Sequence, residues 1–274
     1  ASPIEHTKYP SGQKLCSFQI GGNARVVVYP DSTEALCRAV SLAVYHGLRF
    51  FIVGKGSNLL FADEGFDGVI ICTGKVNGIS IIGSNIRAEC GVSLGTLSRL
   101  AHEHSLTGFE FAHGIPGTVG GGVYMNAGAY GGEICQILTD STCYDGEDRT
   151  VKTLAAPEHS FAYRHSSYRE HPERIVLSAS FALQPGDRAA IRAMMDDLMG
   201  RRMSKQPLEY PSAGSAFKRC EGRFTAQMID EAGLKGFSIG GAQVSEKHAG
   251  FIISRGGATS ADVRGLIAHI QREL

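Results

Sequence analysis

The sequence lacks several features that whole classes of protein require. Its 274 residues carry 27 basic and 27 acidic side chains, so no net positive charge is available to hold nucleic acid by its phosphates. No apolar run approaches the roughly 18 residues of a membrane span, and the first residues lack the apolar core of a signal peptide. Metal-ligand spacing is also missing, because His102 and His104 stand two apart on a predicted helix and diverge. These absences predict a cytoplasmic protein that uses no membrane, nucleic acid or metal.

The cysteines form no disulfide or redox motif. Seven are present, the number is odd, and no C-x-x-C occurs. Several stand in apolar stretches, as Cys72 does after Ile71. A chain of this size has no need of a secreted disulfide framework. We therefore predict reduced, buried thiols.

Glycine is the residue in excess. The 35 glycines are nearly twice the usual share of roughly 7%. They lack the three-residue period of collagen and cluster between apolar runs. These clusters need an explanation, because an ordered glycine loses more conformational freedom than any other residue.

Hydrophobic periodicity predicts an α+β protein. The chain begins with a β-α-β pattern: a strand that ends before Pro30, a helix capped by Asp31 with Glu34, and a strand that ends at Val53. This pattern favours a parallel opening sheet. Strands are predicted over 25–29, 50–53, 68–72, 79–82, 85–90, 138–144, 175–183 and 248–253, and helices over 32–46, 93–104, 187–205, 225–232 and from 260 onward. In the helix at 187–205 the core stripe is predicted to be Ile191, Met194, Met195 and Leu198.

The first glycine cluster, Gly54-Lys55-Gly56-Ser57-Asn58-Leu59-Leu60, directly follows a predicted strand. Successive N–H groups in such a turn can form an anion nest that suits a pyrophosphate. The dinucleotide fingerprint fails because Leu59 occupies the position of its third glycine, and no P-loop pattern is present. Taken alone, the cluster is more often a tight turn without a ligand.

The second cluster, residues 114–132, holds eight glycines in nineteen positions. It is too apolar for a flexible linker, because Ile115, Val119, Val123 and Met125 should be buried. Close packing of the backbone against a large flat ligand explains so many ordered glycines. Packing of the loop on itself is the alternative.

Over nearly its whole length the sequence resembles the UDP-N-acetylenolpyruvoylglucosamine reductases, the MurB flavoenzymes of cell-wall synthesis. The resemblance rests on segments in the family's order, at 20–24, 53–60, 114–132, 163–166, 211–218, 233–236 and 244–251. No long insertion separates Tyr163 from the predicted helix at 187–205, as in the shorter, type II-like subtype.

The resemblance implies an FAD-binding fold of the vanillyl-alcohol-oxidase (PCMH) type, with subdomains over 1–56 and 57–184. A C-terminal α+β substrate-binding lobe would occupy 185–274. FAD and NADPH are the implied cofactors, and the implied reaction reduces UDP-N-acetylglucosamine enolpyruvate to UDP-N-acetylmuramate. A monomeric cytoplasmic enzyme of peptidoglycan synthesis is expected, with a role in cell-wall biogenesis, cell shape and cell division.

The resemblance also implies roles for individual residues. Hydride passes from FAD to C3 of the enolpyruvyl group, Ser215 protonates C2, and Arg164 matches a catalytic arginine whose fork suits a carboxylate. The implied substrate-binding residues are Arg164, Ser215, Lys218 and Tyr124. The implied FAD-binding residues are Gly54, Lys55, Gly56, Ser57, Asn58, Leu59, Pro116, Gly117, Thr118, Val119, Gly121, Gly122, Asn126 and Ala127.

The sequence departs from the family pattern in two places. The family's third catalytic group is a glutamate on a strand beyond the last helix, and no residue before Leu274 matches it, since Glu273 lies in the predicted helix. Arg219 and Cys220 stand where the family usually has Asn-Pro. His113, beside the second cluster, is interpreted as structural.

Two other functions stay open. A flavin- or nucleotide-binding protein without turnover would fit the absence of the glutamate. A serine hydrolase is suggested by residues 236–240, which match G-x-S-x-G around Ser238. That motif needs a strand before the serine and a helix after it, whereas a strand-like stretch follows here.

Overall fold

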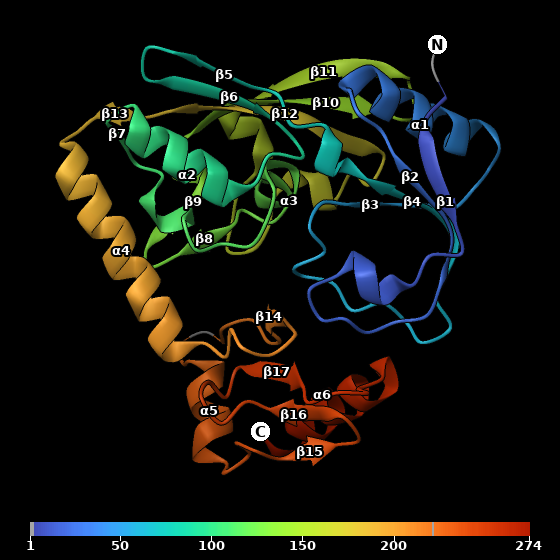
Figure 1. Cartoon of the computed structure of the whole chain (residues 1–274), viewed down its shortest axis with the longest axis vertical. Helices are drawn as coiled ribbons and strands as arrows, with labels where there is room; N and C mark the ends of the chain where they lie inside the picture. The colour runs from blue at the N-terminus through green and yellow to red at the C-terminus, as the bar shows by residue number, and fades with distance from the viewer. Residues whose placement is uncertain (1–2, 221) are drawn as a thin grey trace. The chain divides into compact units, whose positions relative to one another are not determined.

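The computed structural model describes residues 3–220 and 222–274, and the chain divides into two compact units (Figure 1). Of the described residues, one unit contains 3–7, 27–54 and 68–200. The other contains 8–26, 55–67, 201–220 and 222–274. Each unit is therefore assembled from separate stretches of sequence. The predicted division at residues 56 and 184 stays a prediction, and its first two residues lie outside the described part.

Helices and strands alternate in an order that fits the predicted α+β class. The helices are α1 (Thr33–Tyr45), α2 (Leu94–Glu103), α3 (Val119–Tyr124), α4 (Arg188–Lys205), α5 (Thr225–Glu231) and α6 (Ser260–Glu273). The strands are β1 (Glu5–Lys8), β2 (Ala24–Tyr29), β3 (Phe50–Val53), β4 (Phe66–Cys72), β5 (Ile79–Ile82), β6 (Asn85–Glu89), β7 (Leu106–Thr107), β8 (Gly128–Ala129), β9 (Gly132–Glu133), β10 (Leu138–Asp145), β11 (Thr150–Ala155), β12 (Arg174–Ala182), β13 (Gln184–Pro185), β14 (Ser212–Ser215), β15 (Ser238–Ile239), β16 (Ala242–Val244) and β17 (Phe251–Ser254).

The opening sheet has the strand order β1-β2-β4-β3. Strands β3 and β4 run parallel, with Phe50 opposite Val69, as expected of a parallel opening sheet, although that expectation came from the strands at 25–29 and 50–53. Strand β4 lies between β2 and β3, so the two strands that flank α1 are not neighbours. The first glycine cluster begins where β3 ends, after Val53.

The larger sheet of the first unit is five-stranded, in the order β11-β10-β12-β6-β5, and its neighbours pair antiparallel. The short helix α3, formed by the second glycine cluster, packs against β12 and β6. The hydrophobic core of this unit includes Leu36 of α1, Leu97 of α2 and Phe181 of β12, each fully buried. The second cluster therefore rests on the face of a rigid sheet.

The second unit contains a four-stranded sheet in the order β14-β17-β16-β15. Helix α6 packs on β15 and β16, beside which it lies in Figure 1. Its buried face consists of Val263, Leu266 and Ile270, which are three and four residues apart as an amphipathic helix requires. Strand β14 forms an edge of this sheet and carries Ser215 at its last position.

The start of α6 is held by a carboxylate from far along the chain. Asp63 accepts hydrogen bonds from the N–H groups of Ser260 (2.7 Å) and Ala261 (2.9 Å). An acidic group is stabilising there because a helix N-terminus leaves N–H groups unsatisfied and carries partial positive charge. Asp63 thus joins the segment after the first glycine cluster to the C-terminal helix.

Three predictions of local structure need correction. Ser32, not Asp31, caps α1, because the Ser32 side chain accepts from the Ala35 N–H. Met194 of the predicted core stripe is 52% exposed, whereas Met195 is buried. Strand β17 begins at Phe251, since residues 248–250 form a turn closed by the Phe251 N–H and the His248 carbonyl. The elements that the sequence did not predict are the short helix α3 and the strands β1, β7, β8, β9, β11, β13, β14 and β15.

The cysteines are all free, as predicted, but they are not all buried. Burial raises the pKa of the Cys72 thiol to about 11 and that of Cys90 to about 12, so both stay protonated near neutral pH. Cys220 is exposed and corrects the expectation of uniform burial.

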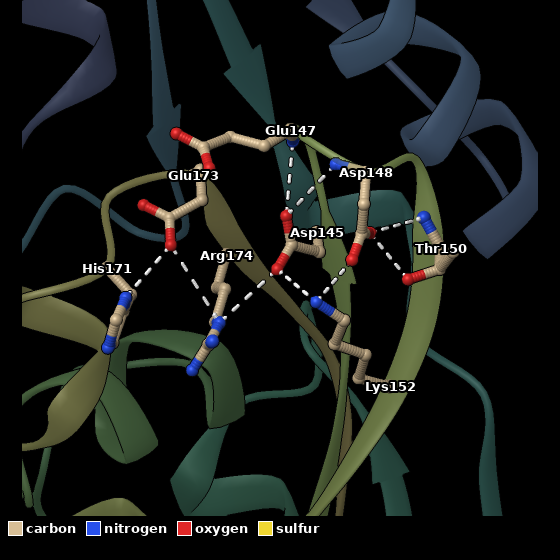
Figure 2. Close-up of polar contacts among 8 residues, drawn as sticks. All are labelled: Asp145, Glu147, Asp148, Thr150, Lys152, His171, Glu173 and Arg174. Atoms are coloured by element: carbon tan, nitrogen blue, oxygen red, sulfur yellow. Dashed lines mark hydrogen bonds and ion pairs between the residues drawn. The ribbon is translucent and has the colours of Figure 1, made fainter.

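An ionic cluster closes the turn between β10 and β11 (Figure 2). Buried Asp145 accepts from Lys152 Nζ (2.7 Å) and Arg174 Nε (3.4 Å), and also from the Glu147 N–H (3.1 Å). The Lys152 contact is the largest cause that lowers the pKa of Asp145, and the N–H groups of Glu147 and Asp148 lower it further against the opposing effect of burial. The carboxylate is thereby satisfied by charge and by backbone, as a buried charge requires.

A buried histidine belongs to a second polar network in the same sheet. His159 Nε2 lies 2.7 Å from Ser141 Oγ, whose oxygen lies 2.7 Å from the Tyr168 hydroxyl, and all three residues are buried. The ring's Nδ1 lies 3.0 Å from the Ala155 carbonyl. A neutral ring that donates from Nδ1 and accepts at Nε2 satisfies every partner. Burial lowers the pKa of His159, which keeps the ring neutral.

We expect the network around His159 to make folding stability depend on pH. Because the pKa of His159 in the folded chain lies below its unfolded value of about 6.5, the unfolded chain binds a proton at this ring more readily than the folded chain does. The contribution of neutral His159 to the free energy of unfolding is therefore fully present above the unfolded pKa and is lost as the pH falls below it. The His159→Gln variant should lose about 2 kcal/mol at neutral pH and show a shallower decline of melting temperature between neutral and mildly acidic buffer.

Burial also lowers the pKa values of His113 and His248. The His159→Gln variant should therefore keep part of the decline of melting temperature with falling pH. An unchanged slope in His159→Gln would contradict the assignment.

Candidate active site

The two glycine clusters meet at Gly54 and Thr118. A Cβ atom on Gly54 would overlap the Thr118 side chain, so glycine is required where the first cluster passes the second. Thr118 is buried and immediately precedes α3. The sequence predicted two separate ligand loops, and the structure places the start of the first loop, at Gly54, against Thr118 of the second.

The first cluster continues at Gly56, which packs against residues 15–17, before strand β2. Gly56 has φ +61°, and a Cβ atom there would overlap the Leu15 carbonyl. Its own carbonyl accepts from the Ser17 N–H (3.2 Å). Lys55 and Asn58 are exposed, and Ser57 is partly exposed. Within the described residues, none of these three side chains has a hydrogen-bond partner, so all are available to a ligand.

Four of the eight glycines in the second cluster are explained by packing inside the protein. A Cβ atom on Gly120 would press against Cys90 at 3.0 Å, and one on Gly122 would press against Leu94 at 3.2 Å. Gly128 and Gly132 are also closely approached, by Glu133 and Phe111 respectively. The loop's own packing therefore accounts for glycine at several positions, as the alternative expected, and the prediction that these glycines pack against a flat ligand stays a prediction.

Gly121 is different from its neighbours. It is exposed, and the nearest heavy atom to an added Cβ would be Thr118 Oγ1 at 3.7 Å, an ordinary contact. Packing therefore does not explain glycine at this position. The open backbone at Gly121, beside Thr118 and Gly54, is the surface on which a ligand could lie against both clusters.

Arg164 lies in a tight turn and contacts the end of the second cluster. Its Nη2 donates to the Gly128 carbonyl (2.6 Å) and its Nη1 to the Asn126 carbonyl (3.3 Å). A guanidinium has five N–H donors, so the remaining three can bind an anion. Arg164 has φ +53°, a strained value for a residue with a side chain. Such strain is typical of functional sites that the surrounding structure holds in place.

Asn126 was predicted to bind the cofactor, but its contacts give it another role. The residue is 1% exposed. Its Nδ2 donates to Glu133 Oε2 (3.0 Å) and to the Ala162 carbonyl (3.1 Å), and its Oδ1 accepts from the Cys135 N–H (3.0 Å). No amide hydrogen is left for a ligand. The partners Glu133 and Ala162 were missed, because nothing in their sequence spacing points to Asn126.

Tyr124 and Ser166 complete the surroundings of Arg164 in this unit. Tyr124 is 41% exposed at the end of α3, so its ring can contact a ligand. Its carbonyl accepts from the buried Ser166 hydroxyl (2.7 Å). Pro116 is exposed, whereas Val119 is fully buried and Ala127 partly so. Val119 can therefore face a ligand only through its backbone.

Ser215 and Lys218 belong to the second unit. Ser215 pairs with Phe251, follows Gly214 at φ +80°, and is exposed. Its hydroxyl makes no hydrogen bond within residues 3–220 and 222–274. The Lys218 side chain is likewise exposed, while its carbonyl accepts from Thr225 Oγ1 (2.5 Å). Both side chains are thus free to reach a ligand.

A cavity of about 880 Å³ lies elsewhere in the second unit. It is lined by Lys14, Tyr210 and Arg255, among others, at the end of β14 where Ser212 pairs with Ile253. Ser215 stands at the other end of that strand, opposite Phe251. None of the residues predicted for the site lines this cavity.

The serine-hydrolase alternative fails on the local fold. Ser238 lies on β15, and a turn followed by strand β16 comes after it instead of a helix. Its hydroxyl donates to the Gly236 carbonyl (3.2 Å). A nucleophile elbow needs a sharp turn from strand into helix, so the sequence match is accidental. Within the described part of the chain, no cluster of His, Cys, Asp and Glu could hold a metal ion, and no helix could span a membrane.

Comparison with known proteins decides the family. Residues 24–153, which hold both glycine clusters, match the model of the FAD binding domain, and residues 206–274 match the C-terminal domain of UDP-N-acetylenolpyruvoylglucosamine reductase. The reductase of that name from Clostridium perfringens is 46% identical over 93% of this chain and 83% of its own length. The chain belongs to the UDP-N-acetylenolpyruvoylglucosamine reductase family.

Other members of the reductase family agree in sequence and in structure. The reductase from Pediococcus pentosaceus is 47% identical over 94% of this chain and 85% of its own. The crystal structure of the reductase (MurB) from Thermus caldophilus matches with a TM-score of 0.86 at 31% identity, over 99% of this chain and 96% of that one. The predicted fold, an FAD-binding domain followed by the reductase family's C-terminal domain, is confirmed.

Proposed function

We propose that this chain is an NADPH-dependent flavoenzyme that reduces UDP-N-acetylglucosamine enolpyruvate to UDP-N-acetylmuramate. Two observations in a member of this reductase family support the proposal. The backbone at Gly121, beside Gly54, is open to a ligand, and the Arg164 guanidinium uses only two of its five N–H donors in contacts with backbone carbonyls. In the cell this activity would serve peptidoglycan synthesis. A monomer working in the cytoplasm is part of the same proposal.

The residues present fit FAD. In the first unit Gly121 offers exposed backbone that packing does not explain. In the second unit the side chains of Lys55, Ser57 and Asn58, beside the left-handed turn at Gly56, have no hydrogen-bond partner among the described residues. These donors suit the pyrophosphate, and the apolar surroundings of α3 suit a flat ring. When bound, FAD supplies the hydride-transfer chemistry, while the protein supplies orientation and charge.

Arg164 would stabilise the charge that develops during reduction. Hydride addition at C3 of the enolpyruvyl group pushes negative charge through C2 onto the carboxylate. A guanidinium held before the reaction stabilises that charge without reorganising. Arg164 meets this condition, because two backbone carbonyls hold it while three N–H donors stay free.

Ser215 would donate the proton that completes the reduction at C2. A hydroxyl is a weak acid, so it must be placed close to the carbon and free of competing acceptors. Ser215 is exposed and unpartnered within the described residues, on a short strand fixed by its pairing with β17. Lys218, three residues on, would bind an anionic group of the substrate.

Anaerobic spectroscopy of the purified protein tests the proposal in two steps. Reconstitution with FAD should give the visible flavin spectrum, and NADPH should bleach it. Addition of the enolpyruvyl substrate should restore the spectrum with stoichiometric formation of UDP-N-acetylmuramate. Failure to bind FAD would refute the proposal, and bleaching without substrate-dependent recovery would favour a flavin-binding protein without turnover. Replacing NADPH by NADH in the first step measures the preference between reductants.

A further inference from the structure

We propose that Asn126 is a positioning residue that holds Arg164 in its working geometry. The inference rests on the proposed function, because it concerns the step in which Arg164 acts. Asn126 reaches Arg164 by two routes. Its main-chain carbonyl accepts from the guanidinium (3.3 Å), and its side-chain Nδ2 donates to the Ala162 carbonyl (3.1 Å), two residues before Arg164.

The turn that carries Arg164 needs such an anchor. The N–H groups of Ala162 and His165 donate to each other's carbonyls across the turn, at 3.3 and 3.1 Å. Arg164 occupies the corner with φ +53°. A side-chain-bearing residue keeps that conformation only where its surroundings impose it. The Ala162 carbonyl accepts hydrogen bonds from both the His165 N–H and the Asn126 side chain. Through this carbonyl the second cluster holds Arg164 in its left-handed conformation.

Glu133 fixes the orientation of the Asn126 amide. Its carboxylate accepts from Nδ2 (3.0 Å), so the nitrogen must face Glu133 and Ala162 while the oxygen faces the Cys135 N–H (3.0 Å). Asn126 itself has φ +43°, which asparagine tolerates better than most residues. The amide is thus locked by three partners and buried, as a precise positioning element must be.

Two variants separate the side chain from the backbone. Asn126→Asp places an oxygen against the acceptors Glu133 and Ala162, whereas Asn126→Gly removes the side chain and keeps the left-handed backbone accessible. Both should slow flavin reoxidation by the enolpyruvyl substrate by about 10- to 100-fold, since small misplacements of a catalytic group cost this much. Flavin reduction by NADPH, in which the proposal gives Arg164 no role, should change by less than about twofold.

Hydrogen exchange supplies a readout that does not depend on activity. In both variants the peptide covering residues 161–166 should exchange faster, because the turn has lost its anchor. Strand β12, which makes no hydrogen bond to the Asn126 side chain in the described part of the chain, should keep its protection. Asp145→Asn is the matched control, since it weakens the same unit through hydrogen bonds to Glu147, Lys152 and Arg174, which lie outside residues 161–166.

The double variant Asn126→Asp with Glu133→Gln tests the pairing itself. The amide introduced at position 133 can donate to the carboxylate introduced at position 126, so the double variant should recover part of the reoxidation rate lost in Asn126→Asp. Unchanged exchange at 161–166 would overturn the inference. Equal slowing of both flavin steps, as in an Asp145→Asn sample of matched melting temperature, would also overturn it. If wild-type protein does not reoxidise with substrate, the proposed function fails, and the exchange data alone decide the positioning role.

Discussion

The Ser215→Ala variant is expected to reduce its flavin with NADPH at the wild-type rate and to lose reduction of the enolpyruvyl substrate. A positioned general acid contributes about 10²- to 10⁴-fold, so the substrate-dependent reoxidation rate should fall by that factor. The removed hydroxyl makes no hydrogen bond within the described residues and its side chain is exposed, so folding should be almost unaffected. Stopped-flow absorbance of the flavin measures the two steps separately.

Ser212→Ala is the matched control, because Ser212 lies on the same strand and pairs with β17 at Ile253. It should leave both steps unchanged. Ser215→Cys keeps an acidic hydrogen at the position and should retain more activity than the alanine variant. Equal slowing of both flavin steps in Ser215→Ala would contradict a role in proton donation.

The Arg164→Lys variant is expected to lower the rate of substrate reduction by about 10²- to 10³-fold, the usual cost of removing a preorganised charge donor. Lysine keeps the charge, but its compact ammonium lacks a planar fork. It therefore cannot contact the carbonyls of Asn126 and Gly128 while binding a carboxylate with two parallel hydrogen bonds. The comparison of kcat with KM for the enolpyruvyl substrate checks the prediction, with the larger loss expected in kcat.

Arg192→Lys provides the control for this change. Arg192 is exposed on α4 and pairs with Asp196 (2.8 Å), so its replacement should affect neither flavin step. A loss in Arg164→Lys confined to KM would show that Arg164 binds ground state and transition state equally, and would contradict its stabilising role.

Local signals in the sequence predicted most elements, because each element carries its own evidence. Ser93 caps α2, and the apolar spacing of Val263, Leu266 and Ile270 fits the buried face of α6. The chemistry of Arg164 and Ser215 came from family resemblance, and their roles stay predictions. Periodicity failed at Met194, where two adjacent methionines fit the same stripe and only Met195 turned inward.

Contacts between distant residues could not be predicted from the sequence. The glycines at 120 and 122 were interpreted as a ligand surface, whereas the structure packs Cys90 and Leu94 against them. Asn126 was interpreted as a cofactor residue, whereas its amide is fully used by Glu133, Cys135 and Ala162. In each case the polar or close contact depends on tertiary placement, for which one sequence carries no local signal.

The hydrogen bonds from Ser260 and Ala261 to Asp63 have a consequence for biosynthesis. They join residues about two hundred positions apart, within a unit that also needs residues 8–26. During translation, residues 55–67 must therefore wait for α6 to leave the ribosome before this carboxylate finds its partners. Such long-range closure is slow and leaves the intermediate exposed. The segment that follows the first glycine cluster therefore reaches its final contacts only after α6 has been made.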